Sequence, residues 1–160
     1  MDTHEFEKLY KNQFDCVYRY SLALTGNPAS AEEITQEAFT RLLRNGFQAS
    51  AIDRPEAWLI RVARNLAIET FRERARDTGG LTVANSKSPE QLLLGNEILR
   101  RILHSLSKLA VSQRECIALR EFGGLSYQEI AGILGTSVDQ VKVHLFRARQ
   151  HLKKELEDLT

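Results

Sequence analysis

The chain has 160 residues and a formal net charge of +1, with 42% hydrophobic and 27% charged residues. This balance is typical of a chain with a packed core and excludes an intrinsically disordered protein. The apolar runs are far shorter than the roughly 20 residues of a membrane-spanning helix, and the first residues lack a signal-peptide pattern. We therefore expect a cytoplasmic protein with no membrane insertion of its own. The length allows one ordinary domain or two small helical ones.

Helical spacing of apolar residues marks the start of the chain. The pattern runs from Phe6 to Ser21 and predicts one long helix or two short ones. Gly26, Asn27 and Pro28 then end the pattern.

Two further helices are expected before residue 77. Ser30 and Glu33 have the spacing of a capping box, in which the serine oxygen accepts the third backbone N–H and the glutamate bonds back, so a helix should begin at Ser30. Asp53 is expected to cap the next helix, with Pro55 in its first turn. The predicted buried stripe of that helix is Leu59, Val62, Ala63, Leu66 and Thr70, and its other face carries Arg61, Arg64, Asn65, Ile68 and Arg72.

The middle of the chain reads as a connection between two domains. Residues 77–88 contain Gly-Gly and Asn-Ser-Lys-Ser segments with few large apolar side chains, and Pro89 follows. We therefore predict a flexible linker over residues 77–90, which joins a first domain of residues 1–76 to a second domain of residues 91–160.

The second domain is expected to be helical as well. Ser88 is expected to cap its first helix, which runs through Leu92 to Leu106. Three later pairs have capping-box spacing and should each open a helix: Ser112 with Glu115, Ser126 with Glu129, and Ser137 with Gln140. No segment shows the strict alternation of a strand, so the predicted fold class is all-α, with two small helical domains.

The last two predicted helices have the layout of a helix-turn-helix. Gly135 turns the chain between a helix with buried Ile130 and Ala131 and a helix with buried Val141 and Leu145. In this motif the second helix can enter the major groove of DNA at its N-terminal end. The side expected to face DNA carries Gln140, Lys142, Val143, His144, Phe146 and Arg147, and the helix continues with Arg149.

Charge supports contact with a polyanion. Residues 142–154 carry five cationic Lys and Arg side chains and no acidic one, and residues 57–76 carry five arginines against two glutamates. Basic stretches on a nearly neutral chain indicate two local nucleic-acid contacts, although solvated helix faces would explain the charges equally well.

Several motifs in the same order resemble those of the extracytoplasmic-function (ECF) sigma factors. Residues 31–42 are similar to a polar, acidic helix of their region two, and residues 55–68 to a later helix of that region. Residues 125–131 and the end of the chain, with Val141-Lys142 and Arg147-Ala148-Arg149, are similar to their region four. The resemblance implies an alternative sigma factor that binds core RNA polymerase, recognises promoter DNA as duplex and as melted strand, and promotes transcription initiation. It also implies an anti-sigma partner.

The resemblance assigns roles to three groups of residues. The polymerase-binding group is Glu33, Gln36, Glu37 and Arg41, which would offer polar partners to a basic coil of the polymerase clamp. The group for the melted minus-ten element is Arg61, Arg64, Asn65 and Arg72, assisted by the preceding loop of residues 46–54. The group for the minus-thirty-five element is Gln140, Lys142, Val143, His144, Arg147 and Arg149.

The family usually carries a small polar residue and an arginine where this chain has Val143 and His144, which changes the expected promoter preference. We expect His144 to lie opposite the buried stripe and face base edges, while Lys142, Arg147 and Arg149 mostly hold phosphates.

Two other classes of protein compete with this interpretation. An enzyme is disfavoured, because no histidine follows a glutamate by three residues and the phosphate-binding and zinc-protease motifs are missing. Cys16 and Cys116 are far apart and outside any zinc-type spacing, so we interpret both as small buried apolar residues and expect no cofactor or metal. A repressor or activator of duplex DNA, with a dimerisation or ligand domain first, stays open.

Overall fold

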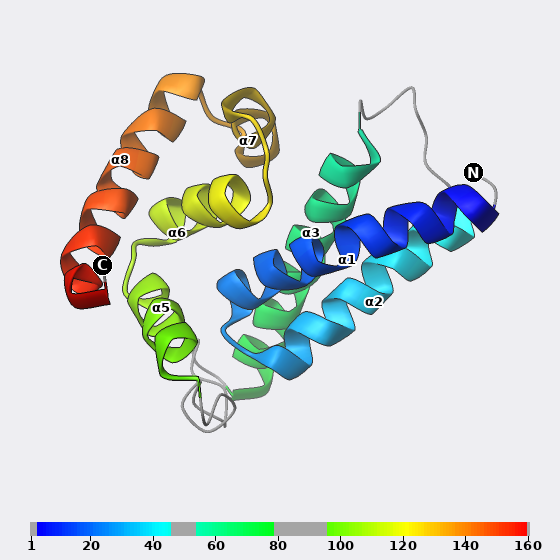
Figure 1. Ribbon diagram of the computed structural model, residues 1–160, viewed down its shortest axis with the longest axis horizontal. Coiled ribbons are helices and arrows are strands. Elements are labelled where there is room, and N and C mark those ends of the chain that lie inside the picture. The colour runs from blue at the N-terminus through cyan, green and yellow to red at the C-terminus, as the bar shows by residue number, and fades with distance from the viewer. Residues whose placement is uncertain (1–2, 46–53, 79–95, 160) are drawn as a thin grey trace.

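The computed structural model describes residues 3–45, 54–78 and 96–159. All regular structure in these ranges is helical, with no strand, which confirms the all-α prediction (Figure 1). None of the described helices combines the length and apolar character that a membrane crossing requires.

The first half is a bundle of α1 (Thr3–Thr25), α2 (Pro28–Asn45) and α3 (Pro55–Thr78). Its largest fully buried side chains come from all three helices: Tyr20, Phe39, Leu42, Leu59 and Ile60. The Phe39 ring of α2 is packed among aromatic rings of α1. The nearest of these is Tyr10, whose ring centroid lies 4.9 Å from that of Phe39. A single helix therefore covers the apolar pattern from Phe6 to Ser21.

The second helix begins two residues earlier than the sequence pattern suggested. The Asn27 side-chain oxygen accepts the backbone N–H groups of Ala29 (2.9 Å) and Ser30 (3.2 Å), and Pro28 occupies the first helical position. Ser30 is buried inside α2, where its hydroxyl accepts a hydrogen bond from Arg74 at 2.8 Å. The predicted cap at Ser30 is therefore wrong, because the asparagine side chain already satisfies the first free N–H groups.

The third helix starts at Pro55, as predicted, whereas Asp53, its expected cap, lies outside the described residues. The helix continues to Thr78, so the expected boundary after residue 76 cuts through its last turn. The rest of the predicted linker and the predicted helix start at Ser88 also lie outside the described residues.

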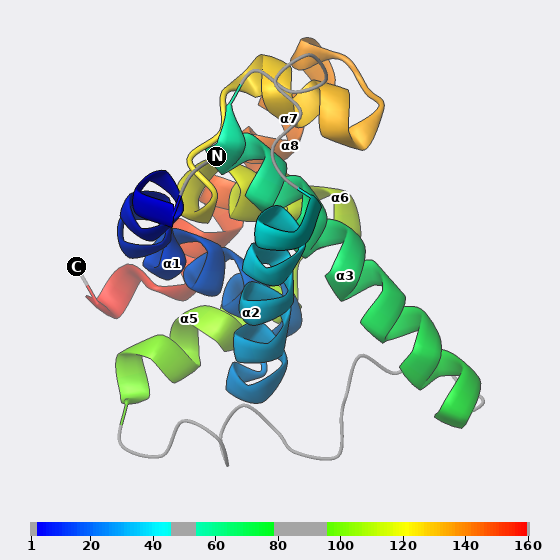
Figure 2. The same cartoon turned by 90° about the vertical axis from the view of Figure 1, so that its right-hand side faces the viewer.

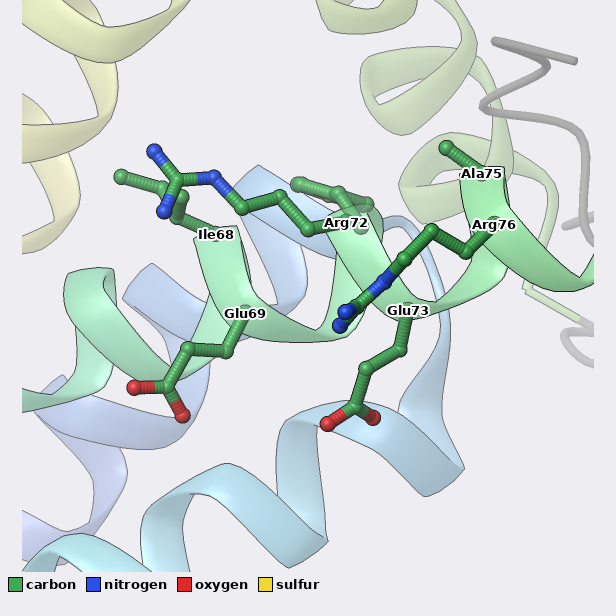
Figure 3. A pocket seen from close by; sticks show the side chains of 7 residues that line it. Ile68, Glu69, Arg72, Glu73, Ala75 and Arg76 are labelled. Carbon is green, nitrogen blue, oxygen red and sulfur yellow. The ribbon is translucent and has the colours of Figure 1, made fainter.

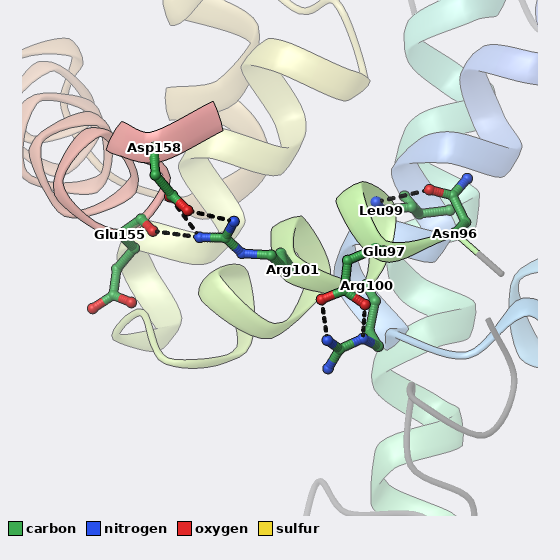
Figure 4. Close-up of polar contacts among 7 residues, drawn as sticks. All are labelled: Asn96, Glu97, Leu99, Arg100, Arg101, Glu155 and Asp158. Atoms are coloured by element: carbon green, nitrogen blue, oxygen red, sulfur yellow. Dashed lines mark hydrogen bonds and ion pairs between the residues drawn. The ribbon is translucent and has the colours of Figure 1, made fainter. Parts of the chain in front are cut away.

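The second half comprises α5 (Glu97–Ser107), α6 (Val111–Ile117), α7 (Tyr127–Leu134) and α8 (Val138–Glu155), with a π-helical turn η1 (Ala118–Phe122) after α6 and a 3-10 turn η2 (Glu157–Leu159) at the end. Asn96 caps α5 by accepting the N–H of Leu99 at 3.0 Å. Arg101 of α5 donates two hydrogen bonds to Asp158, at 2.8 and 2.7 Å, and thereby ties the first and last elements of this half together (Figure 4).

Of the three predicted capping boxes in this half, one is complete, one is found with its serine bond only, and one is wrong. Ser126 accepts the N–H of Glu129 at 3.1 Å and Glu129 accepts that of Ser126 at 2.9 Å, which is a complete capping box. Ser137 accepts the N–H of Gln140 at 3.1 Å. The prediction at Ser112 is wrong: α6 begins at Val111 after Ala110, with no side-chain cap among the described residues.

The two halves are packed against each other. Helix α1 lies along η1 (Figure 1), and the Cys16 thiol of α1 donates to the Phe122 carbonyl at 3.2 Å. Burial raises the pKa of Cys16, which keeps the thiol neutral and able to donate. Cys116 is fully buried, whereas Cys16 is only half-buried at this junction, so the prediction of two buried cysteines holds for one of them. The C-terminal part of α3 extends beyond the junction with the second half (Figure 2), where Arg74 still contacts Ser30 of α2.

The turn between α7 and α8 provides a test of the fold. Gly135 has φ +66°, and its surroundings would leave space for a Cβ atom. Gly135→Ala should therefore destabilise the protein by about 1 to 2 kcal/mol through backbone strain alone. Gly132→Ala is the matched control, since Gly132 is an exposed helical residue with equal space. It should stabilise the protein by about 1 kcal/mol. Urea denaturation of both variants measures the difference, and equal midpoints would contradict the strained turn.

Candidate functional site

Helices α7 and α8 form the predicted helix-turn-helix. The chain turns over residues 135–137, between the left-handed Gly135 and the capping Ser137. Ile130 of α7 is buried, as are Val141 and Leu145 of α8, and α8 also packs against α6. The second helix is thus held along one side and presents its other side to solvent.

The solvent side of α8 is both basic and apolar. Gln140, Lys142 and Arg147 are exposed, and neither cation is ion-paired within the described part of the chain. Between them lie two exposed apolar side chains, Val143 at 42% and Phe146 at 61% of full exposure. Phe146 is the more exposed of the two, but the predicted minus-thirty-five group contains only Val143.

His144 does not lie opposite the buried stripe, so that prediction is wrong. The side chain is only partly exposed, and its Nδ1 atom is buried without a hydrogen-bond partner among the described residues. At 100° per residue, position 144 is about 60° from Val141 on the helix, while position 143 is about 160° from it. The residue directly opposite the core is therefore Val143, and His144 lies on the flank.

Arg149 already has a partner within the second half. Its guanidinium donates to Glu121 at 2.7 Å, with both side chains about half exposed. Hydrogen bonds to Glu121, and next to Tyr127, raise the pKa of Arg149. A phosphate contact by this residue must therefore compete with an existing carboxylate.

The minus-ten group divides into two parts on α3. Arg61, Asn65 and Arg72 are exposed and follow one another at four and seven residues, which places them on one stripe with the partly exposed Ile68. Figure 3 shows Arg72 and Ile68 on one side of the helix, with the Glu69 and Glu73 side chains pointing away from them.

Arg64 lies at the edge of this stripe and is turned into the junction between the halves. Its Nε donates to Glu115 Oε1 of α6 at 2.9 Å, and the two side chains retain only 18% and 17% of their exposure. The structure therefore does not bring Arg64 together with the exposed members of its predicted group. No sequence signal joins residues 51 positions apart, so this contact was missed.

The residues predicted to bind polymerase form a continuous face of α2. Glu33 and Gln36 are exposed, while Glu37 pairs with Arg41 at 3.1 Å, the solvated ion pair expected of two residues one turn apart. Leu43, seven residues after Gln36, adds a 66% exposed apolar side chain to the same face. Leu43 was not predicted as part of this face, because a leucine at helical spacing is usually interpreted as a core residue.

Comparison with known proteins identifies both halves. Residues 9–77 match the family described as "Sigma-70 region 2", and residues 99–152 match "Sigma-70, region 4". The fold and the two matches in this order define a protein of the sigma-70 type.

Individual relatives narrow the class. The ECF RNA polymerase sigma factor SigW of Bacillus subtilis is 33% identical over 159 residues, covering 91% of this chain and 85% of SigW. BldN of Streptomyces coelicolor, also named an ECF RNA polymerase sigma factor, is 35% identical over 160 residues, and the chain spans 61% of its length. The chain therefore belongs to the ECF sigma factors.

Solved structures share the fold. The sigma factor RpoE from Bartonella quintana, solved in complex with the anti-sigma factor NepR, has a TM-score of 0.77 at 24% identity, with 97% of this chain and 98% of that chain covered. CnrH, solved in complex with the cytosolic domain of CnrY, has a TM-score of 0.69 at 24% identity, with 99% and 92% covered.

The environment of Arg64 predicts a stability difference between neighbouring arginines. Arg64→Ala leaves the Glu115 carboxylate shielded from water without its cation, which should cost about 1 to 3 kcal/mol. Arg61→Ala, on the exposed stripe of the same helix, should change stability by no more than about 0.5 kcal/mol. Thermal unfolding followed by circular dichroism compares them. A similar small loss for both variants would mean that the ion pair contributes nothing to folding.

Proposed function

We propose that this protein is an alternative sigma factor, which binds core RNA polymerase, recognises promoter DNA and promotes promoter melting. The observation that carries the proposal is the occurrence, in one chain and in order, of both sigma-70 regions, the second with a complete helix-turn-helix. The region two match over residues 9–77 also argues against a repressor, whose first half would be a ligand or dimerisation domain. We infer a non-enzymatic role.

The α2 face is the proposed polymerase contact. Glu33, Gln36 and Glu37 offer acceptors and negative charge to a basic helical surface, with Arg41 beside them. The exposed Leu43 would supply the apolar contact that polar rims surround in protein interfaces.

The proposed minus-ten contact is the exposed stripe of α3. Arg61 and Arg72 would follow the phosphates of a melted strand, and Asn65 between them offers an amide that can pair with a base edge. Arg64 belongs to the same proposed contact, but its guanidinium must first leave Glu115.

The proposed minus-thirty-five contact is the solvent side of α8. Lys142, Arg147 and, after release from Glu121, Arg149 would hold phosphates, while Gln140 and Val143 are directed at base edges. His144, on the flank, would act at the rim of this contact.

An anti-sigma factor is the remaining proposed partner. RpoE and CnrH, which share the fold, were solved with the anti-sigma factor NepR and with the cytosolic domain of CnrY, respectively. This supports the same kind of partner here.

Run-off transcription with core RNA polymerase on fragments of genomic DNA tests the function. The wild-type protein should yield discrete transcripts, and Glu37→Lys should weaken core binding in a pull-down because it reverses a charge at the rim of the contact. Glu155→Lys, a charge reversal at an exposed residue of the second half, is the control and should leave core binding unchanged. Unaltered core binding by Glu37→Lys at moderate salt would remove α2 from the contact.

The apolar side chains on α8 predict a preference for thymine. Phe146 and Val143 can contact the 5-methyl group of thymine in the major groove. Replacing the contacted thymine by deoxyuridine should weaken duplex binding about fourfold, the worth of one buried methyl group. Phe146→Ala should bind both duplexes alike.

Lys142→Ala is the control for this prediction. It should weaken both duplexes equally and reduce the salt dependence by about one counterion. If wild-type protein binds the thymine and deoxyuridine forms of every site equally, Phe146 and Val143 do not face the bases.

A further inference from the structure

Among the described residues, hydrogen bonds from the side chains of Cys16, Arg54 and Arg64 join the two halves of the molecule. On α1, the Cys16 thiol donates to the Phe122 carbonyl. On the α3 side, Arg54 donates to both carboxylate oxygens of Glu129, at 2.8 and 3.2 Å, and Arg64 pairs with Glu115. Arg54 and Arg64 are ten residues apart, about 15 Å along the helix, so the first half of α3 is held at two separate points.

The Arg64 contact is the more enclosed of the two ion pairs. Arg64 and Glu115 are less than one-fifth exposed, whereas Arg54 is 44% exposed and Glu129 27%. The charges of this pair also act on the fully buried Tyr20 of α1, whose hydroxyl has no hydrogen-bond partner among the described residues. Its pKa is raised, first by burial and then by the charge of Glu115, while Arg64 acts in the opposite direction. The Arg64–Glu115 pair, which joins α3 to α6, exists only while the halves are together.

The rest of the junction is close-fitting. A Cβ atom at Gly123, just after η1, would lie 3.4 Å from the Ile60 side chain of α3 and 2.8 Å from the Leu119 carbonyl oxygen. Because Arg64 and Glu115 are 2.9 Å apart and less than one-fifth exposed, a nucleic-acid strand that binds the Arg64 guanidinium has to compete with the Glu115 carboxylate.

We propose that Glu115 is an intramolecular competitor of the melted DNA strand for Arg64. With the halves together, the carboxylate holds the guanidinium that would otherwise contact a phosphate or base, and the free protein binds single-stranded DNA through Arg61, Asn65 and Arg72 only. Separation of the halves releases Arg64 to the edge of that stripe. This inference rests on the proposed function, since it specifies how the minus-ten surface is regulated.

The test compares Glu115→Gln with Glu155→Gln in the full chain. The first removes the interdomain charge at nearly constant volume, and the second removes a carboxylate that pairs with Lys108 inside the second half. Two quantities are measured: the rate at which iodoacetamide alkylates Cys16, and the affinity for a fluorescent single-stranded DNA pool of random sequence. Cys16 reports separation because its thiol is protected at the junction, and the fully buried Cys116 serves as the internal reference.

Glu115→Gln should accelerate Cys16 alkylation and tighten single-stranded DNA binding about tenfold, as expected when a competent form rises from about one-tenth of the population to nearly all of it. Glu155→Gln should match wild type in both measurements. Faster alkylation with unchanged DNA affinity would overturn the proposal, because the pair would then hold the halves together without withholding Arg64. No change in either measurement would overturn it as well.

A charge exchange keeps the proposal falsifiable if Glu115→Gln misfolds. Glu115→Arg alone places two cations together and should expose Cys16, whereas Glu115→Arg combined with Arg64→Glu should restore its protection and bind DNA no better than wild type. Failure of the double variant to restore protection would overturn the pairing. If Glu115→Gln gains DNA affinity but neither it nor wild type supports transcription with core polymerase, the competition stands and the sigma-factor function fails.

Discussion

Helix α3 contacts three environments: the core of the first half, the second half and solvent. The arrangement of the molecule depends on which side chains of α3 face each of them. Leu59 and Ala63 are fully buried in the hydrophobic core. Ile60 and Arg64 face the second half, and a stripe with Arg61 and Arg72 faces solvent. A helix offers about 100° of rotation per residue, so neighbouring positions fall on different faces without any change in backbone. The same rotation places Arg64 next to the basic stripe and within reach of Glu115.

Sequence patterns predicted the features that local chemistry determines. The all-α class follows from the apolar spacing, and the turn at Gly135 follows from a residue that accepts positive φ without strain. Capping was predicted correctly at Ser126 and Ser137. It failed at Ser112, and it failed at Ser30 because Asn27, three residues earlier, already caps the helix. When two residues that favour the N-cap position stand close together, the sequence alone does not show which of them begins the helix.

The missed features depend on distant parts of the chain. The Arg64–Glu115 pair joins residues that no periodicity relates, and it separates Arg64 from the neighbours with which sequence analysis grouped it. His144 is an exception, because helix rotation alone places it about 60° from Val141, on the flank of the buried stripe, where packing also covers a ring nitrogen. The roles of the exposed residues of α2, α3 and α8 stay predictions, since exposure and charge define a surface but not its ligand.

The chemistry of the junction suits a reversible contact. An apolar pair at positions 64 and 115 would hold the halves together at least as well, because replacing a buried ion pair by well-packed apolar residues is often neutral or stabilising. An apolar junction would, however, contain no charged group for which a polyanion could compete, so binding of the polyanion would not open it. A guanidinium held by one carboxylate can exchange that partner for a phosphate without losing its charge compensation, so the ligand itself offsets the loss of this ion pair. The more exposed Arg54–Glu129 pair is weakened by salt and solvent and opposes separation less. An ion pair at Arg64 therefore couples the arrangement of the halves to the presence of nucleic acid, which packing alone cannot do.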